Sequence, residues 1–430
     1  DGSNGFIITG EFGSRTGNFV APAGDVNNDG IDDLVIAGFF GEFGYIIYGR
    51  DGNFPAELVA ASITADDGVM VNSRETPAND FSAVAAARYA GDVNNDGIDD
   101  VIFSSNSDST LAASATYVLF GRNGNFGARI NLFELDGSDG FAMDIRSITT
   151  QEIVGDSVSG IGDVNGDGID DIIASSIFLS IAGGTNNGAV FVVFGHEGQF
   201  PARMDLGSLD GSNGFSVSGA GFNYGFGHAL SRIGDINDDG IDDIGIGSYR
   251  YRDGAPQVGR VYVLYGRRSA FPVTMEADSI RSPEGFRVTS DQFLGRLGSG
   301  LASAGDFNRD GLNDLIIGEP GPIAQTGLAG RVHVIYGQSG LYPDEINVST
   351  LPGSVGVTIV GNVDDRLGVS VEMGGDLNGD SYDDLVIAAN GAIDADTNTV
   401  TGNHYVVLNN ATDVLFDAGF ETTALPVRLP

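Results

Sequence analysis

The chain has 430 residues, no Cys, no Trp, and 59 acidic side chains against 21 basic ones, giving a formal net charge of −38. A surface this acidic repels nucleic acid and anionic membranes, so neither is an expected partner, and without Cys there are no disulfides, thiolate metal sites or Cys nucleophiles. The chain is 41% hydrophobic, which is too apolar for a disordered protein. The acidity therefore points to cation binding. No apolar run reaches the roughly 18 residues of a membrane span.

One segment recurs six times along the chain. It reads GDVNNDGIDDLVIA from Gly24 and returns from Gly91, Gly162, Gly234, Gly305 and Gly375, at intervals of 67, 71, 72, 71 and 70 residues. A fixed period of this length is typical of a repeat architecture in which each unit buries its faces against its neighbours.

Each repeat is predicted to contain four short strands. In chain order these are a Gly-Phe strand (as at 214–217), a strand leading into the acidic segment (229–233), an apolar strand after it (34–37) and an alternating strand that ends in Tyr-Gly or Phe-Gly (261–266). No segment has a helical period. Six such repeats predict an all-β fold, a β-propeller of six four-stranded blades. A linear solenoid is the competing architecture, but its repeats are shorter.

We expect the propeller to span residues 1–410, with repeats starting near residues 1, 66, 136, 210, 283 and 352. The first repeat begins with a Gly-Phe strand at 5–10, whereas no such strand is recognised after 404–408. We therefore expect the N-terminal strand to complete the sixth blade and remove a sheet edge. Residues 411–430 form a C-terminal tail whose apolar residues suit docking on this chain or on another copy of it.

The acidic segment has the pattern D-x-N-x-D-G-x-x-D, which indicates a calcium-binding loop. Side-chain oxygens at positions 1, 3 and 5, a backbone carbonyl at position 7 and a carboxylate at position 9 form an all-oxygen set, which suits Ca²⁺ better than Zn²⁺ or copper. Gly at position 6 allows the tight turn with positive φ. An EF-hand is not predicted, because position 12 is Ile36 rather than Glu and a strand follows. The alternative is a set of acidic surface turns, which would be strongly self-repulsive.

About six Ca²⁺ ions are therefore expected. The predicted ligands are Asp25, Asn27, Asp29, Ile31 and Asp33; Asp92, Asn94, Asp96, Ile98 and Asp100; Asp163, Asn165, Asp167, Ile169 and Asp171; Asp235, Asn237, Asp239, Ile241 and Asp243; Asp306, Asn308, Asp310, Leu312 and Asp314; and Asp376, Asn378, Asp380, Tyr382 and Asp384. The sites are expected to be unequal, because the sixth has Ser381 where the others have Gly and the fifth carries Arg309 and Asn313. We expect the fourth to be the tightest and the fifth or sixth the weakest.

The strand, loop, apolar strand and Tyr/Phe-Gly strand together resemble the FG-GAP repeat of integrin α-subunit propellers, in the form found in bacterial extracellular proteins. Phe226-Gly227 and Gly318-Glu319-Pro320 match the two halves of the family's name. The resemblance implies Ca²⁺ in the hairpin between the first two strands of each blade, an extracellular or cell-surface location, and adhesion or recognition through the opposite face. Integrin propellers have seven blades, so seven is the alternative blade number. No other integrin α domain is recognised.

The function expected from the sequence is an extracellular calcium-binding module that recognises a protein or glycan, and not an enzyme. None of the four His has a clustered partner in the sequence, and without Lys a phosphate-binding P-loop and Schiff-base chemistry are excluded. A structural subunit that assembles with copies of itself into a filament or surface layer is the alternative, and a carbohydrate-active enzyme with paired carboxylates is the third possibility.

Overall fold

The computed structural model describes residues 5–10, 16–38, 43–73, 82–107, 115–149, 154–181, 186–220, 225–252, 257–322, 327–391, 402–409 and 414–417. Within these ranges the fold is all-β, as predicted. The helical elements there are five single 3₁₀ turns: η1 (Ala60–Ser62), η2 (Leu132–Glu134), η3 (Leu206–Ser208), η4 (Ala277–Ser279) and η5 (Val348–Thr350).

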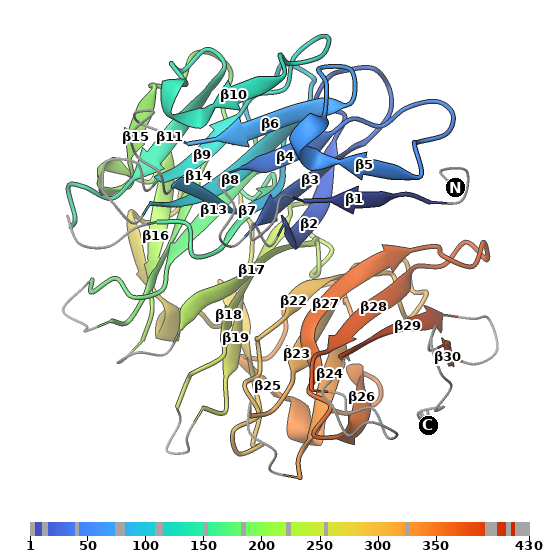
Figure 1. The fold of residues 1–430 in the computed structure, drawn as a ribbon. Coiled ribbons are helices and arrows are strands. Elements are labelled where there is room, and N and C mark those ends of the chain that lie inside the picture. Colours follow the sequence, from blue (N-terminus) through green and yellow to red (C-terminus); the bar gives the residue numbers. More distant parts are fainter. Residues whose placement is uncertain are drawn as a thin grey trace.

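Six sheets each contain four antiparallel strands (Figure 1). In the first five sheets one short strand lies between the third and the fourth strand in the chain. The first strands are β2 (Thr16–Gly24), β7 (Ser82–Gly91), β12 (Val158–Gly162), β17 (Phe226–Gly234), β22 (Leu301–Gly305) and β27 (Leu367–Gly375). The second strands are β3 (Asp33–Gly38), β8 (Asp100–Ser107), β13 (Asp171–Ser176), β18 (Asp243–Ser248), β23 (Asp314–Glu319) and β28 (Asp384–Ala389). The third strands are β4 (Gly44–Ile47), β9 (Ala115–Leu119), β14 (Ala189–Val193), β19 (Arg260–Leu264), β24 (Ala329–Ile335) and β29 (Asn403–Asn409). The fourth strands are β6 (Gly68–Asn72), β11 (Gly140–Asp144), β16 (Gly214–Ser218), β21 (Gly285–Thr289), β26 (Gly356–Val363) and β30 (Val414–Asp417).

A three-residue strand that the sequence analysis did not predict joins successive repeats. These strands are β10 (Arg129–Asn131), β15 (Arg203–Asp205), β20 (Thr274–Glu276) and β25 (Glu345–Asn347). Each comes from one repeat and pairs in parallel with the fourth strand of the preceding sheet. The fourth strands β6, β11, β16 and β21 are therefore each held on their outer side by the next repeat along the chain, whereas β26 has no such partner among the described residues.

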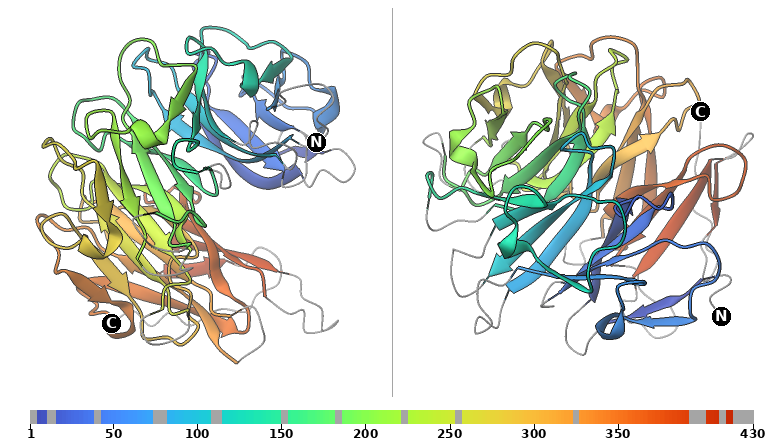
Figure 2. Two further views of the ribbon diagram at one scale, coloured as in Figure 1. Left: turned by 90° about the vertical axis from the view of Figure 1, so that its left-hand side faces the viewer. Right: turned by 90° about the horizontal axis from the view of Figure 1, so that it is seen from above.

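The sheets follow one another along an arc in chain order, as in a β-propeller (Figure 2). The first strands of consecutive sheets, from β2 to β27, lie against one another. One buried apolar cluster fills each of the five junctions between neighbouring sheets. After its first aspartate, each second strand begins with a run of three nonpolar residues, because both faces of the strand lie against neighbouring sheets. In β23, for example, Leu315 and Ile317 pack toward the fourth sheet and Ile316 toward the sixth.

The ends of the chain differ from the expected ring closure. The N-terminal strand β1 (Ile7–Thr9) pairs in parallel with β5 (Glu57–Val59), and β30 lies beside β29. The prediction that the N-terminal strand completes the sixth blade is therefore wrong, because residues 414–417 of the expected tail take that position. The rest of the expected tail, residues 411–413 and 418–430, lies outside the described residues. How many blades the closed ring has stays a prediction.

Candidate metal-binding loops

The six acidic segments form the hairpins between the first and second strands of the sheets, all at the same end of the sheets. The first strand always ends at the glycine before position 1, and the second begins at the aspartate of position 9. This is the location expected from the sequence. Positions 1 to 9 are counted from the first Asp of each loop, which is Asp25 in the first.

Backbone amides of each loop bind the carboxylate of position 1. In the first loop the N–H groups of Asp29 and Gly30 donate to the two Asp25 oxygens over 2.9 and 2.7 Å. The Asp29 N–H also donates to Asn27 Oδ1 (3.1 Å), and Ile31 N–H donates to Asp29 Oδ1 (3.0 Å). The position 1 pair recurs in all six loops over 2.7–3.0 Å. The predicted oxygen ligands of positions 1, 3 and 5 thus come from one compact turn.

The aspartate of position 9 has a structural role that the sequence did not reveal. Asp33 is buried, and its oxygens accept from Val26 N (3.1 Å) and Gly49 N (2.8 Å). The corresponding pair in the sixth loop comes from Leu377 N and Asn409 N, both over 2.8 Å. This carboxylate therefore ties its loop to the end of the third strand. The motif alone shows an acidic residue here but not its acceptor role.

The loop carboxylates repel one another at close range. The pKa of Asp33 is raised to about 7, mainly by burial and to a smaller extent by the charges of Asp29 and Asp25, against the lowering effect of the two backbone hydrogen bonds. Burial likewise raises the pKa of Asp171 and Asp243 to about 8, with the same secondary contribution from the carboxylates of their own loops. A cation at the loop would relieve this repulsion.

The residues fit a hard cation by their donor chemistry. Carboxylate, amide and carbonyl oxygens are the ligands that Ca²⁺ prefers. In the fourth loop Asn237 is only 4% exposed, and its Oδ1 has no hydrogen-bond partner. A buried amide oxygen without a partner is costly unless something binds it. Across the described ranges, however, no three His, Cys, Asp or Glu side chains are grouped closely enough to hold a metal ion.

Two details bear on how unequal the loops are. Ser381 has a φ of +70°, as its place in the loop predicts. The other five loops have Gly at this position, with φ between +82° and +93°. Arg309 does not point into its loop. Its guanidinium donates to the Asn409 carbonyl (2.7 Å) and lies over the Tyr382 ring (3.7 Å), so it binds the sixth sheet instead.

The histidines include one cluster that the sequence did not predict. His333 is fully buried on β24, with Nε2 3.0 Å from Glu319 Oε2 and Nδ1 2.9 Å from Thr358 Oγ1. These three residues lie side by side on neighbouring strands inside the fifth sheet. Because Glu319 and His333 have no exposed surface, we interpret the cluster as a polar cross-strand contact within the sheet.

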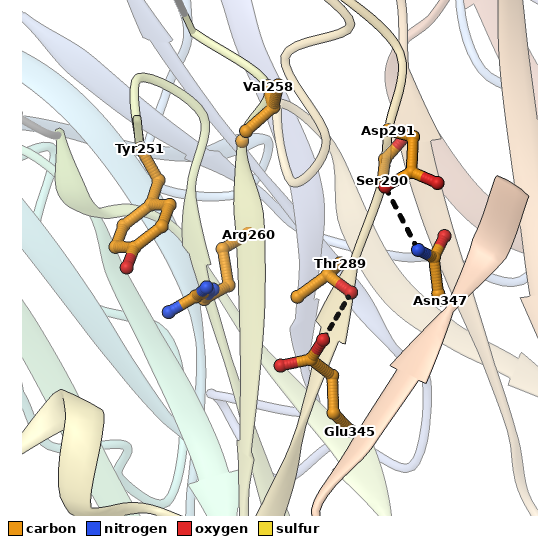
Figure 3. Close-up of a pocket in the computed structure, with 9 residues that line it drawn as sticks. Tyr251, Val258, Arg260, Thr289, Ser290, Asp291, Glu345 and Asn347 are labelled. Carbon is orange, nitrogen blue, oxygen red and sulfur yellow. Dashed lines mark hydrogen bonds between the residues drawn. The ribbon is translucent and has the colours of Figure 1, made fainter. Parts of the chain in front are cut away.

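A polar cavity of about 200 Å³ lies at the end of the fourth sheet opposite the loops (Figure 3). Arg260 is largely buried there, with its guanidinium 3.8 Å from the centre of the Tyr251 ring. On the other side Thr289 donates to Glu345 (3.2 Å), and Asn347 donates to Asp291 (3.1 Å). The cavity therefore combines a cation, an aromatic ring and two carboxylates.

Comparison with known proteins agrees with the architecture. Residues 297–335 and 367–408 match the FG-GAP repeat family. These two segments are therefore similar to FG-GAP repeats, and the all-β fold is of the β-propeller class. The chain is 35% identical to integrin alpha-5 of Xenopus laevis over 193 residues, which are 44% of this chain and 16% of the integrin. It is 31% identical to integrin alpha-IIb of Mus musculus over 175 residues, 39% of this chain and 15% of the integrin.

An enzyme is also among the relatives. The phosphatidylinositol-glycan-specific phospholipase D of Mus musculus is 34% identical over 157 residues, which are 34% of this chain and 18% of the enzyme. The chain thus matches less than a fifth of the length of each of these three relatives. Within the described residues, no helix has both the length and the apolar character needed to cross a membrane.

Proposed function

We propose that the chain is an extracellular recognition module whose propeller is stabilised by calcium in its six loops. The proposed calcium binding rests on one observation. The same turn of oxygen donors occurs at the same place in all six sheets. In each loop the side chains of positions 1, 3 and 5 and the carbonyl of position 7 would hold the ion. The position 9 carboxylate would contribute through the lone pairs that its two backbone hydrogen bonds leave free.

Bound calcium would act structurally. It neutralises carboxylates that otherwise repel one another and fixes the hairpin that joins the first two strands. Ligands that bind only the native state stabilise it by mass action. The test is to strip the protein of metal and measure calcium content and binding on reloading. Failure to bind calcium would overturn this part of the proposal.

The recognition part has separate support. The similar integrins and the similar phospholipase D are known by different activities, so what this stretch of chain has in common with them is the repeat rather than a reaction. The cavity beside Arg260 and Tyr251 lies away from the loops, on the end of the sheets that the FG-GAP resemblance assigns to recognition. A guanidinium, an aromatic face and paired acceptors suit a protein loop with an acidic side chain or a glycan.

Screening the intact protein against glycan and matrix-protein arrays in millimolar calcium would identify the ligand class. Arg260→Ala should abolish binding of that ligand, whereas Arg268→Ala, which removes the same charge from an exposed position in the segment after β19, should leave it unchanged. Equal affinity of both variants for the ligand would exclude the cavity as the recognition site. Calcium content serves as the check that both variants are folded.

A further inference from the structure

Among the described residues, β26 is the one fourth strand of the first five sheets whose outer edge is unpaired. At the other four outer edges, the N–H two residues after the first glycine of the strand donates to the carbonyl in front of the short parallel strand. These bonds are Met70 N to Ala128 O, Ala142 N to Ala202 O, Ser216 N to Val273 O and Arg287 N to Asp344 O, over 3.0–3.1 Å. Thr358 is the equivalent residue of β26, and within the described ranges its N–H has no such acceptor. The backbone of β26 can therefore pair with one more strand.

Two side chains of β26 are exposed where their counterparts are buried. Val357, which follows the first glycine, is partly exposed. The residues at its place in the four covered strands are all fully buried, namely Val69, Phe141, Phe215 and Phe286. Val360 is 49% exposed, whereas Asp144 and Ser218 at the same place in β11 and β16 are 5% and 2% exposed. The edge of β26 is therefore apolar as well as unpaired.

A shortened connection in the sixth repeat explains why β26 has no cover. In each of the second to fifth repeats, the segment between the third and fourth strands supplies the short strand that covers the preceding sheet. These segments are residues 120–139, 194–213, 265–284 and 336–355, each 20 residues long. In the sixth repeat only the four residues 410–413 separate β29 from β30. They are too few to form a strand on the fifth sheet and return, so any cover for β26 must come from another part of the chain.

The covering segments share a sequence pattern. Each begins with an aromatic residue and ends, four residues later, with Leu, Ile or Met, and four of the five have Pro after the aromatic residue. They are Phe54-Pro55-Ala56-Glu57-Leu58, which covers β1, Phe126-Gly127-Ala128-Arg129-Ile130, Phe200-Pro201-Ala202-Arg203-Met204, Phe271-Pro272-Val273-Thr274-Met275 and Tyr342-Pro343-Asp344-Glu345-Ile346.

The two ends of this pattern pack against the covered strand. In four of the segments the aromatic ring stacks on a Phe ring that follows the first glycine of that strand, with ring centres 4.1–4.5 Å apart. The last residue is at most 8% exposed in the same four segments: Leu58, Met204, Met275 and Ile346. The middle residue is exposed in all five. The pattern is therefore a signature of a strand that covers an outer edge.

The C-terminal tail contains a related segment, Leu425-Pro426-Val427-Arg428-Leu429. Pro and Leu occupy the second and fifth positions, and Arg428 stands at the place of Arg129 and Arg203. The first position is Leu rather than an aromatic residue, which matches a strand that has Val357 where β11, β16 and β21 have Phe. The tail follows the sixth repeat, just as each other covering segment belongs to a repeat after the sheet that it covers.

The prolines of the tail fit the same edge. In the register of the other short strands Arg428 lies opposite Thr358, so the residues before and after Arg428 make the hydrogen bonds to Thr358. Pro426 and Pro430 then stand at positions whose N–H would face away from β26, and they remove no hydrogen bond from the pair. The linker also has a suitable length. Ten residues, 418–427, separate β30 from Arg428, and nine separate the third strand from the short strand in each of the second to fifth repeats.

We propose that residues 425–430 of the chain's own C-terminal tail bind along the outer edge of β26 as a short parallel strand. Leu425 would cover Val357, and Leu429 would be buried against the fifth sheet. The tail would thus supply the cover that the connection of the sixth repeat is too short to give. This inference depends neither on the proposed calcium binding nor on the proposed ligand recognition.

Because the chain has no Cys, an introduced disulfide can test the pairing directly. In the proposed register Pro430 lies opposite Val360, within the distance that a disulfide can bridge. Val360→Cys combined with Pro430→Cys should form a disulfide within one chain on mild oxidation, as shown by a non-reducing gel and peptide mapping. Val363→Cys combined with Pro430→Cys is the matched control. Val363 is also exposed but lies three residues further along β26, so this pair should stay reduced.

Three outcomes of the disulfide experiment would overturn the proposal. No disulfide in either variant would mean that the tail does not reach β26. Equal cross-linking in both would mean that it has no fixed register there. Disulfide-linked dimers would assign the edge to the tail of a second copy.

Two substitutions in the tail give a second measurement. Leu429→Asp places a charge at the position that the proposal buries, and it should lower the melting temperature by about 2 °C or more. Val427→Asp is the matched control and should leave the melting temperature unchanged, because the equivalent residue is exposed in every covering segment and is Asp344 in one of them. Equal effects of the two substitutions would contradict the proposal. Far-UV circular dichroism confirms that each variant is folded.

Discussion

The fourth and sixth loops share one motif but lie in different surroundings. In the fourth, the Gln338 and Gly340 N–H groups of the next sheet donate to the carbonyls of Ile236 and Asn237 over 3.1 and 2.8 Å. Ile236 is fully buried, whereas its counterpart Leu377 in the sixth loop is more than half exposed. The burial of a loop is therefore set by the sheet that follows it rather than by its own residues.

This difference should extend to metal binding. The neighbouring sheet holds the fourth loop in place before an ion arrives, and less ordering on binding means a tighter site. Among the described residues no neighbouring sheet covers the sixth loop in this way, and Ser381 has a φ of +70° there, where a side chain costs about 1–2 kcal/mol. We expect the fourth loop to bind calcium most tightly and the sixth most weakly.

The largest expected effect comes from removing calcium from all loops together. At a calcium concentration 100 times the dissociation constant, each site stabilises the native state by roughly 2.7 kcal/mol. Chelation with EDTA should therefore lower the melting temperature by at least about 10 °C, as followed by calorimetry. The same melting curve with and without EDTA, from protein shown to contain calcium beforehand, would mean that the loops hold their shape without the ion.

The next largest effect is expected at position 2, where Ile236 of the fourth loop can be compared with Leu377 of the sixth. Ile236→Ala should cost about 3 kcal/mol because it leaves a cavity in a buried junction. Leu377→Ala should change the free energy of unfolding by less than about 0.5 kcal/mol, because its side chain is largely in water. Urea unfolding in excess calcium measures both. Similar losses for the two variants would show that the sixth loop is covered in solution.

The aspartates at position 1 allow the fourth and sixth loops to be compared through one of their predicted calcium ligands. Asp235→Ala removes two hydrogen bonds to a carboxylate and one ligand of the tightest site, which should cost about 3 kcal/mol. Asp376→Ala should cost clearly less than Asp235→Ala, because the carboxylate of Asp376 is in water. Asp306→Ala is expected between them. A greater loss for Asp306→Ala than for Asp235→Ala in the same unfolding experiment would reverse the predicted order of the sites.

The smallest effect concerns position 6. Ser381→Gly should stabilise the protein by about 0.5–1 kcal/mol and tighten the sixth site, because glycine adopts a positive φ without strain. Gly240→Ser in the fourth loop is the matched reverse change and should destabilise by a similar amount. Calorimetry in calcium detects both. If neither change shifts the melting temperature, backbone strain at position 6 does not distinguish the loops.

Much of the architecture could be predicted because the same sequence pattern occurs six times in the chain. The loop, the apolar second strand and the Tyr/Phe-Gly strand each have a local pattern, and the hairpin position of the loop follows from their order. The parallel strands such as β15 could not be found, since Arg203–Asp205 alternates over only three residues and is held by pairing with β11 rather than by its own preference. Short elements of this kind are specified by their neighbours.

The site was predicted less completely than the fold. The motif identifies Asp33 as acidic but not as an acceptor for two backbone amides, which depends on a third strand 16 residues away. Nor does it show that Arg309 turns to Asn409, 100 residues further along. The pairing of His333 with Glu319 lies across strands, so spacing in the sequence gives no signal for it. The ring closure was wrong for a related reason, because β30 has no Gly-Phe start.

The most direct test of the account is the number of calcium ions that one chain binds. Metal-stripped protein should be titrated with calcium in a calorimeter, and the bound metal should be measured independently by elemental analysis after dialysis. The account predicts six ions per chain in more than one affinity class, with the strongest class reduced by Asp235→Ala and the weakest by Asp376→Ala. A chain that binds no calcium, or a single ion that neither substitution affects, would contradict it.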